Sequence, residues 1–584
     1  MIKLMKTNTI FNDICYNKLK MEDNNMKAYI SKLYDFDHSL ESTQYILDHK
    51  KDFIIPIYQR RYSWEEKQIT ELFDTLTNND GLSDIFMGTI QLNHENEEKY
   101  EIIDGQQRLT TFILLLEALD IKDSLYKSFK LLNIDTDLDT LLSEENNNPD
   151  KSVSQIYKSA KKIIKKYIED KEAIKENLKR TYFVVLETEN RQPSEIITIF
   201  NRLNTTGLDL NSTDIFKIDY YDYLKRKYSS EEDWIKKIND CYTKIDEAND
   251  KMTNKHPKIP SIKLDWVLTV YKYIIASSIK GNNHKDIFKS NTSFFSELFK
   301  HEERFTDETR NLLEFDKFKL LVDVFIATYK IIYQGDFSSP DYLAVCFIEK
   351  TRYSFFWILP FFANFYYYLD KKDNHYDSID SDILEACVKI AHYLIVQSIN
   401  NDKRINSSIS FIFNNILLKF KEKKYDEIKE DVSNETETLK ENFINKINGN
   451  IFDNQKKCRI LCLLSAYLEE IKANTNPQEI YKLLFSDEYH SFDNEHIIAQ
   501  SKFGQFDEEQ KTLLNTLGNI VLLERSPNRS LQDSEVCYKK DTYIASPLVI
   551  VKNLGNDIIK EWTIKDVEKR KETENNKILE YLFK

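Results

Sequence analysis

Glycine and proline are scarce in this chain of 584 residues, which contains only 10 of each. Average proteins use roughly 7% glycine and 5% proline, and turn-rich β architectures depend on both. Their scarcity therefore favours long helices joined by polar loops. The length corresponds to about three or four domains, so more than one core is expected. We expect a multidomain, mainly helical protein with small α+β parts.

Cysteine usage and hydropathy predict a cytoplasmic protein with no membrane partner. The seven cysteines are scattered and odd in number, unlike a disulfide framework. The most membrane-like run, Tyr353 to Leu369, falls short of about 20 apolar residues and contains Pro360 and Asn364. A buried, kinked helix is expected there instead. The formal net charge is −14, so any binding of nucleic acid must depend on local basic patches.

A set of polar residues between positions 492 and 529 is hard to explain by folding alone. Their order predicts a strand with Glu495 and His496, a loop, a second strand with Asn519, and a helix with Asn528. Phosphodiester hydrolysis needs a base, a divalent cation and a rigid scaffold that holds both. His496 is the natural base near neutral pH, and Glu495 and Asn528 carry the hard oxygen ligands that Mg²⁺ accepts. Asn519 is placed to hydrogen-bond the far ring nitrogen.

Taken singly, each of these residues also suits a structural role as a strand cap, a turn or a helix cap. Their combined order, with Lys539 and Lys540 on a following helix, indicates a metal-dependent nuclease. At these residues the chain resembles the HNH, or ββα-metal, nucleases. The resemblance is greatest to the HNH domain of GmrSD-type modification-dependent restriction enzymes, and it covers residues 456–571.

The resemblance implies a role for each residue of the motif. His496 is implied as the general base and Asn519 as its orienting partner. Glu495 and Asn528 are implied as ligands of one Mg²⁺ or Mn²⁺ ion. Asp493 is a second carboxylate that is able to replace Glu495 as the metal ligand, so the choice between these two stays open.

A second motif, KYEIIDGQQRLTTFILLLEAL, lies nearer the N-terminus. It predicts a strand from Tyr100 to Ile103, a turn at Asp104 and Gly105, and a helix from Leu109 to Leu119. This order aims backbone N–H groups and the positive helix end at one point, which suits a phosphate group. Side chains that add donors for a polyphosphate come from this turn and from a preceding segment: Gln106, Gln107, Arg108, Gln59, Arg60 and Arg61. The chain has no P-loop sequence, and a purely structural turn remains the alternative.

Three segments, IPIYQRRYSW, IIDGQQRLTT and FNRLNTTGLDLNSTDIFK, resemble the ParB/sulfiredoxin-like N-terminal domain of GmrSD and SspE proteins. The resemblance covers residues 29–224. It implies binding and hydrolysis of a nucleoside triphosphate (NTP) at the turn around Gly105. It also implies that a loop with Asn204 and Gly207 closes over this site.

Residues 225–455 alternate apolar helices with polar loops and carry no recognisable chemistry. We expect a helical middle domain that couples the state of a nucleotide-binding sensor domain to the state of the nuclease domain. The whole chain is expected to be a nucleotide-regulated, modification-dependent restriction endonuclease that acts on modified phage DNA in anti-phage defence. A homo-oligomer is left open. The alternatives are an NTP-controlled DNA-binding or signalling protein with an inert HNH fold, and an HNH nuclease for unmodified DNA or RNA.

Overall fold

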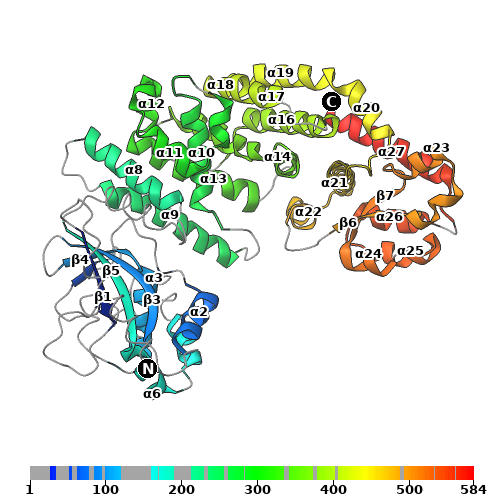
Figure 1. Ribbon diagram of the computed structural model, residues 1–584. Coiled ribbons are helices and arrows are strands. Elements are labelled where there is room, and N and C mark those ends of the chain that lie inside the picture. Colours follow the sequence, from blue (N-terminus) through cyan, green and yellow to red (C-terminus); the bar gives the residue numbers. More distant parts are fainter. Residues whose placement is uncertain are drawn as a thin grey trace, which may run out of the picture. The chain divides into compact units, whose positions relative to one another are not determined.

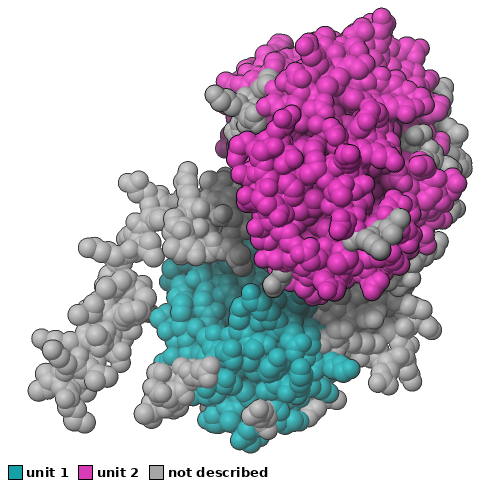
Figure 2. Space-filling view, turned by 90° about the vertical axis from the view of Figure 1, so that its right-hand side faces the viewer, with its two compact units in different colours: residues 1–240 teal, residues 241–584 magenta. Residues whose placement is uncertain are grey.

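A computed structural model places both sequence motifs in regular secondary structure (Figure 1). The chain divides into two compact units, residues 1–240 and 241–584 (Figure 2). The predicted sensor domain lies in the first unit, and the predicted nuclease domain lies in the second with most of the predicted middle domain. The structure describes residues 26–33, 46, 52–54, 62, 64–77, 84–94, 99–119, 121, 160–168, 170–189, 212–228, 234–255, 261–281, 283–334, 341–371, 376, 378–401, 406–486, 492–531, 533–558 and 561–584.

The first unit is built on a five-stranded mixed sheet with the strand order β1-β5-β3-β4-β2. Strand β3 runs parallel to β5 and antiparallel to β4, while β1–β5 is antiparallel and β2–β4 is parallel. The strands are β1 Met26–Lys32, β2 Asp52–Ile54, β3 Ile85–His94, β4 Lys99–Asp104 and β5 Thr181–Glu189. The helices are α2 Glu66–Thr77, α3 Gln106–Ala118, α6 Lys171–Lys179 and α8 Ser212–Lys227, and α9 Trp234–Lys255 continues into the second unit.

Helix α3 is the central helix of the first unit, because nearly all of its side chains are buried. Phe112 packs edge to face on Phe183 of β5 with 5.7 Å between the ring centroids. A fully buried side chain of this kind stabilises a fold by about 1.5–3 kcal/mol. Gly105 joins β4 to α3 with a φ of 91°, and a Cβ atom there would lie 2.3 Å from Ile90. Only glycine fits this turn, and the predicted order of strand, turn and helix is confirmed.

The second unit begins with a helical body, as expected from the scarcity of glycine and proline. Its elements are α10 Leu264–Ala276, η2 His284–Phe288, α11 Asn291–Leu298, η3 Glu302–Arg304, α12 Asp307–Leu312, α13 Phe315–Gln334, α14 Asp341–Lys350, η4 Ser354–Ile358, α15 Leu359–Tyr368, α16 Ser381–Asn400, α17 Asn406–Phe411, η5 Ile412–Ile416, α18 Leu417–Lys421, α19 Tyr425–Thr438 and α20 Lys440–Asn448.

The apolar run from Tyr353 to Leu369 is buried inside this body, as predicted. It forms the 3₁₀ helix η4 followed by α15, and Pro360 stands at the first turn of α15. Proline is tolerated at that position because the first helical N–H groups have no partner within the helix. Asn364 is fully buried and donates to Thr328 at 2.8 Å. Among the described residues, no helix is both long and apolar enough to cross a bilayer.

The C-terminal part of the second unit carries a two-stranded antiparallel hairpin. Strands β6 Phe492–His496 and β7 Ile520–Glu524 pair so that His496 lies opposite Ile520 and Glu495 opposite Val521. Helix α24, Arg525–Leu531, packs on both strands. The predicted order of strand, connection, strand and helix is confirmed, but the connection contains two helices, η6 Gln500–Gln505 and α23 Glu508–Leu514, where a loop was expected. The remaining elements are α21 Gln455–Lys472, α22 Pro477–Leu484, α25 Val536–Ile544, α26 Val549–Asp557 and α27 Ile564–Leu582.

Helices α21 and α27 hold the hairpin against the helical body. Both helices pack on α16, and α21 also packs on both strands. Gly518 stands just before β7, where a Cβ atom would lie 2.2 Å from the carbonyl oxygen of Val567 in α27. A side chain at position 518 would therefore push the hairpin away from α27, and this close approach explains the glycine.

Candidate active site

His496 and Glu495 lie on opposite faces of the hairpin, because successive side chains alternate along a strand. The ring of His496 packs against Phe452, with 4.4 Å between ring centroids, and against Phe503 at 5.6 Å. On the other face, Glu495 contacts Lys539 of helix α25. The hairpin thus separates an aromatic pocket around the histidine from a buried ion pair.

His496 is held as an uncharged imidazole. Burial lowers its pKa to about 4, and the nearby Lys539 ammonium acts in the same direction. Its Nε2 lies 3.1 Å from Oδ1 of Asn515, whose amide nitrogen donates to the carbonyl of Lys511. With the amide oriented in this way, Nε2 must be the nitrogen that donates its hydrogen. The lone pair of the ring is therefore on Nδ1, the nitrogen able to accept a proton near neutral pH.

Asn519 does not make the predicted hydrogen bond to the imidazole. Its side chain is fully buried, and its Oδ1 accepts from the backbone N–H of Ile498 at 2.7 Å. Its Nδ2 donates to the carbonyls of Ile498 and Leu514, both at 3.1 Å. These backbone groups lie in the connection between β6 and β7, where no described strand supplies hydrogen-bond partners. The side-chain amide of Asn519 supplies those partners instead. Asn519 therefore orders the backbone that follows His496 and does not contact its ring through a hydrogen bond.

Asn515 holds the ring in place of Asn519, and sequence reasoning missed it. The residue caps the C-terminus of α23, four positions before Asn519 in the same connection. An asparagine at a helix end is usually explained by the turn itself. The one available signal was a second asparagine, four positions before Asn519, ahead of the second predicted strand.

Glu495 is engaged in a buried ion pair and not in an open site. Its Oε1 accepts from Lys539 at 2.6 Å and from the hydroxyl of Tyr543 at 3.2 Å. Lys539 is fully buried and also donates to the carbonyl of His496 at 2.7 Å. Burial raises the pKa of the Glu495 carboxyl, and the Lys539 ammonium opposes this shift. Two oxygen atoms thus surround one buried cation, the ammonium of Lys539.

The two other predicted metal ligands lie near helix α24. Asp493 is half-buried and forms an ion pair with Arg525, whose Nε is 3.3 Å from its Oδ2. Asn528 is also half-buried and stands three positions after Arg525, so both residues share one face of α24. No group of three or more His, Cys, Asp and Glu side chains suited to a metal ion occurs in the described part of the chain. The donors fit Mg²⁺ by their oxygen chemistry, but binding at Glu495 requires the release of Lys539.

The turn in the first unit combines buried polar groups with an uncapped helix end. Gly105 is the N-cap of α3 and offers no side-chain cap, so the first N–H groups of the helix lack a side-chain acceptor. Gln106 is buried, and neither its amide nitrogen nor its amide oxygen has a hydrogen-bond partner. Gln107 is buried as well. An unpaired buried amide is costly, and a bound ligand with donors and acceptors would satisfy it.

Arg108 is folded back onto the sheet. Its Nη1 donates to the carbonyl of Met87 at 2.9 Å, and its Nη2 lies 3.4 Å from Oδ2 of Asp104. Burial raises the pKa of Asp104, while the Arg108 guanidinium lowers it. The structure therefore brings Asp104, Gln106 and Arg108 together at one turn. The other predicted nucleotide-binding residues, Gln59, Arg60, Arg61 and Asn204, lie outside the described residues.

Comparison with known protein families places the chain among the restriction endonucleases. Residues 43–221 match the family described as GmrSD restriction endonuclease, N-terminal domain. Residues 437–573 match the family described as GmrSD restriction endonucleases, C-terminal domain. The chain therefore belongs to the GmrSD restriction endonucleases, which confirms the resemblance to that family. No curated protein matches the chain.

The two family matches contain the two sites described above. The turn around Gly105 lies within the first match, and the hairpin with His496, Glu495 and α24 lies within the second. Residues 222–436 lie between the two matches and include most of the helical body.

Proposed function

We propose that this restriction endonuclease hydrolyses DNA phosphodiesters with His496 as the general base. The observation that supports this role is the buried, uncharged imidazole with its lone pair on Nδ1. Nδ1 accepts a proton from water, the water oxygen bonds to phosphorus, and the bond from phosphorus to the leaving oxygen breaks. Asn515 accepts the hydrogen bond from Nε2 and holds the ring in its plane while the imidazolium forms.

We also propose that the hairpin and α24 form an HNH, or ββα-metal, site for one Mg²⁺ or Mn²⁺ ion. When bound, such an ion polarises the phosphoryl oxygen and stabilises the leaving group. Asn528 and either Glu495 or Asp493 would hold it. Asp493 needs to leave only a partly exposed ion pair with Arg525, whereas Glu495 must exchange the buried ammonium of Lys539 for the metal ion.

The turn of the first unit is proposed as an NTP-binding site in a ParB/sulfiredoxin-like domain. Its support is the unpaired buried amide of Gln106 beside an uncapped helix end, which together suit phosphate oxygens and a polar base. We propose that the bound NTP and modified phage DNA together control the nuclease, in the cytoplasm of a cell under phage attack. A coupling of roughly 1–3 kcal/mol between the two ligands corresponds to about 5–150-fold in affinity.

The test of the nuclease is Mg²⁺-dependent cleavage by the full chain, with a panel of modified and plain DNA of one sequence. His496→Ala should lower cleavage by roughly 10²–10⁴-fold. The control is His301→Ala, which removes an exposed histidine paired with Glu303 and should leave cleavage unchanged. Full cleavage by His496→Ala would remove this residue from the mechanism. Equal cleavage of modified and plain DNA would favour a nuclease for unmodified DNA, and no cleavage by the wild type would favour an inert fold.

Coupling is tested separately with the His496→Ala protein, which should cleave its DNA roughly 10²–10⁴-fold more slowly. NTP affinity should differ by about 5–150-fold between modified and unmodified DNA, because coupling between two ligands is reciprocal. Equal affinities would overturn the regulatory part of the proposal and leave the nuclease part standing.

A further inference from the structure

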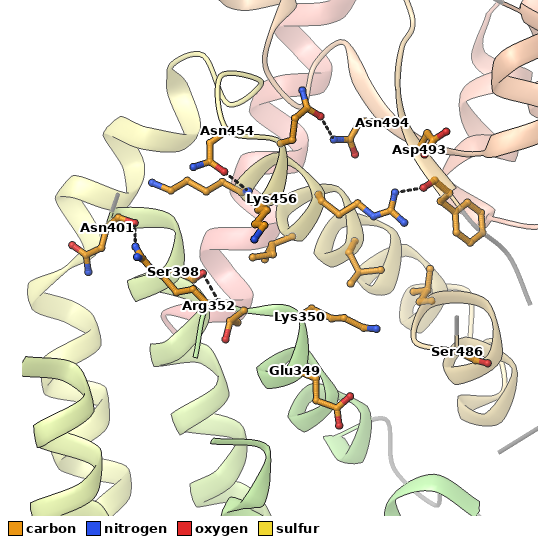
Figure 3. A pocket seen from close by; sticks show the side chains of 18 residues that line it. Glu349, Lys350, Arg352, Ser398, Asn401, Asn454, Lys456, Ser486, Asp493 and Asn494 are labelled. Carbon is orange, nitrogen blue, oxygen red and sulfur yellow. Dashed lines mark hydrogen bonds between the residues drawn. The ribbon is translucent and has the colours of Figure 1, made fainter. Parts of the chain in front are cut away.

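A cavity of about 790 Å³ lies beside the hairpin in the second unit. Five parts of the chain line it: the end of α14 and the turn after it, the end of α16, the first half of α21, the end of α22, and strand β6 (Figure 3). Ligand sites in proteins usually measure about 300–1,000 Å³, so this cavity has the size of a binding site. It joins the segment between the two family matches to the proposed nuclease.

The cavity is basic although the protein is acidic. Five basic residues line it, with two acidic ones, Glu349 and Asp493, so the net charge of the lining is about +3 against −14 for the whole chain. The basic residues are Lys350, Arg352, Lys456, Lys457 and Arg459. Gathering like charges in one hollow costs electrostatic free energy, and an anionic ligand offsets that cost.

Neutral groups orient several of these basic side chains. Arg352 donates to the carbonyl of Asn401 at 2.6 Å, and Lys350 donates to the carbonyl of Phe485 at 3.3 Å. Arg459 donates to the carbonyl of Phe492. The carbonyl oxygen of Asn401 directs the guanidinium of Arg352 without cancelling its charge. A guanidinium held in this way keeps further N–H donors for phosphate oxygens.

The cavity borders the strand that carries the proposed catalytic histidine. Phe492 and Asn494 of β6 line it, and both lie on the same strand face as His496. His496 follows Asn494 by two positions, which is roughly 7 Å along a strand. Asn494 also has a buried side-chain oxygen without a partner, while its amide nitrogen donates to Gln455. The lining therefore reaches Asn494, two strand residues before the proposed base.

We propose that this cavity binds the phosphodiester backbone of the DNA substrate and guides it to His496. The inference rests on the proposed nuclease function and deepens it. It gives the segment between the family matches a role in substrate binding, because Lys350 and Arg352 come from that segment. Contacts of this kind position DNA and do not read its sequence, so plain duplex DNA is a sufficient probe.

The experiment measures DNA binding by the full chain without divalent cations, so that no cleavage occurs. Affinity for a plain duplex is followed from about 50 to 200 mM salt in the wild type and in Arg352→Gln/Lys456→Gln. Each lost phosphate contact reduces the salt slope by about 0.9. The wild type should therefore lose about 12-fold more affinity than the double variant over this fourfold range of salt.

The matched control is Arg310→Gln/Lys472→Gln, which also replaces one arginine and one lysine. Both are exposed residues outside the cavity lining, so the salt slope should equal that of the wild type. Lys456→Gln alone is the second variant if the double variant unfolds. It removes a cation from the first turn of α21, where positive charge is unfavourable for the helix. The wild type should lose about 3.5-fold more affinity than this single variant over the same range of salt.

Equal salt slopes in the wild type and both cavity variants would overturn the proposal, as would a wild type that does not bind DNA. Inorganic tripolyphosphate distinguishes a free polyphosphate from DNA as the ligand. If the cavity variants weaken tripolyphosphate binding and leave the DNA slope unchanged, the cavity belongs to a free anion and the DNA assignment falls. Cleavage by the wild type with Mg²⁺ is measured separately. If the wild type cleaves DNA but the cavity variants have its salt slope, only the cavity proposal is rejected. If the cavity variants have a reduced salt slope but the wild type does not cleave DNA, only the nuclease proposal is rejected.

Discussion

Replacing Asn515 with aspartate should raise the pKa of His496 and move the acid limb of cleavage to higher pH. The amide oxygen of Asn515 lies 3.1 Å from Nε2, so Asn515→Asp puts a negative charge at that distance. At an effective dielectric constant of about 20, the attraction to an imidazolium is about 5 kcal/mol. The partly buried carboxylate loses hydration in return, and such neighbours shift a pKa by about 1–3 units.

The size of the effect follows from the starting pKa. The pKa of His496 is about 4, so the wild-type imidazole is about nine-tenths uncharged at pH 5. If the aspartate raises this pKa by about 2 units, only about one-tenth remains uncharged. Because the base must be unprotonated to accept a proton, cleavage at pH 5 should fall about tenfold. At pH 8 both imidazoles are uncharged, so the two rates should agree within a few-fold.

The assay is single-turnover cleavage of one DNA between pH 4.5 and 8.5, reported as the ratio of variant to wild type. Asn414→Asp is the control, because it adds the same charge at an exposed helical position. Its ratio should not change with pH. The same ratio at pH 5 and pH 8 for Asn515→Asp would refute the assignment of Asn515 as the partner of the catalytic ring.

Three further variants test the parts around these sites. Asn519→Ala leaves buried backbone groups without partners and should destabilise the second unit by about 2–4 kcal/mol; thermal unfolding that matches the wild type would contradict this. Lys539→Met leaves Glu495 as an unpaired buried carboxylate and should cost about 3–5 kcal/mol. Mn²⁺ should stabilise this variant more than the wild type, and equal stabilisation would argue against Glu495 as the ligand. Arg108→Ala removes the cation beside Asp104 and should weaken NTP binding and hydrolysis without unfolding, whereas unchanged turnover would make the turn purely structural.

The residues that sequence reasoning placed correctly are those governed by local rules. Gly105 between an apolar strand and an apolar helix predicts its turn, because only glycine reaches that backbone conformation without strain. The run from Tyr353 to Leu369 is too short and too interrupted for a membrane span, and it is buried as expected. The role of His496 as the base stays a prediction, which was made because few residues other than histidine serve as a base near neutral pH.

The partners of these residues were decided by the tertiary structure. Glu495 and Lys539 are far apart in the sequence and meet because α25 packs on the hairpin. Asn515, and not Asn519, reaches the imidazole because the end of the connection between the strands turns one amide toward the ring and the other toward the backbone. Arg352 and Asn494 line the same cavity only because α21 joins the helical body to the nuclease hairpin. By itself the sequence determined the order of elements at the two motifs and the family, and it predicts the base, since these depend on neighbours along the chain. Which charges and amides pair depends on how those elements pack, and that information is spread over residues distant in sequence.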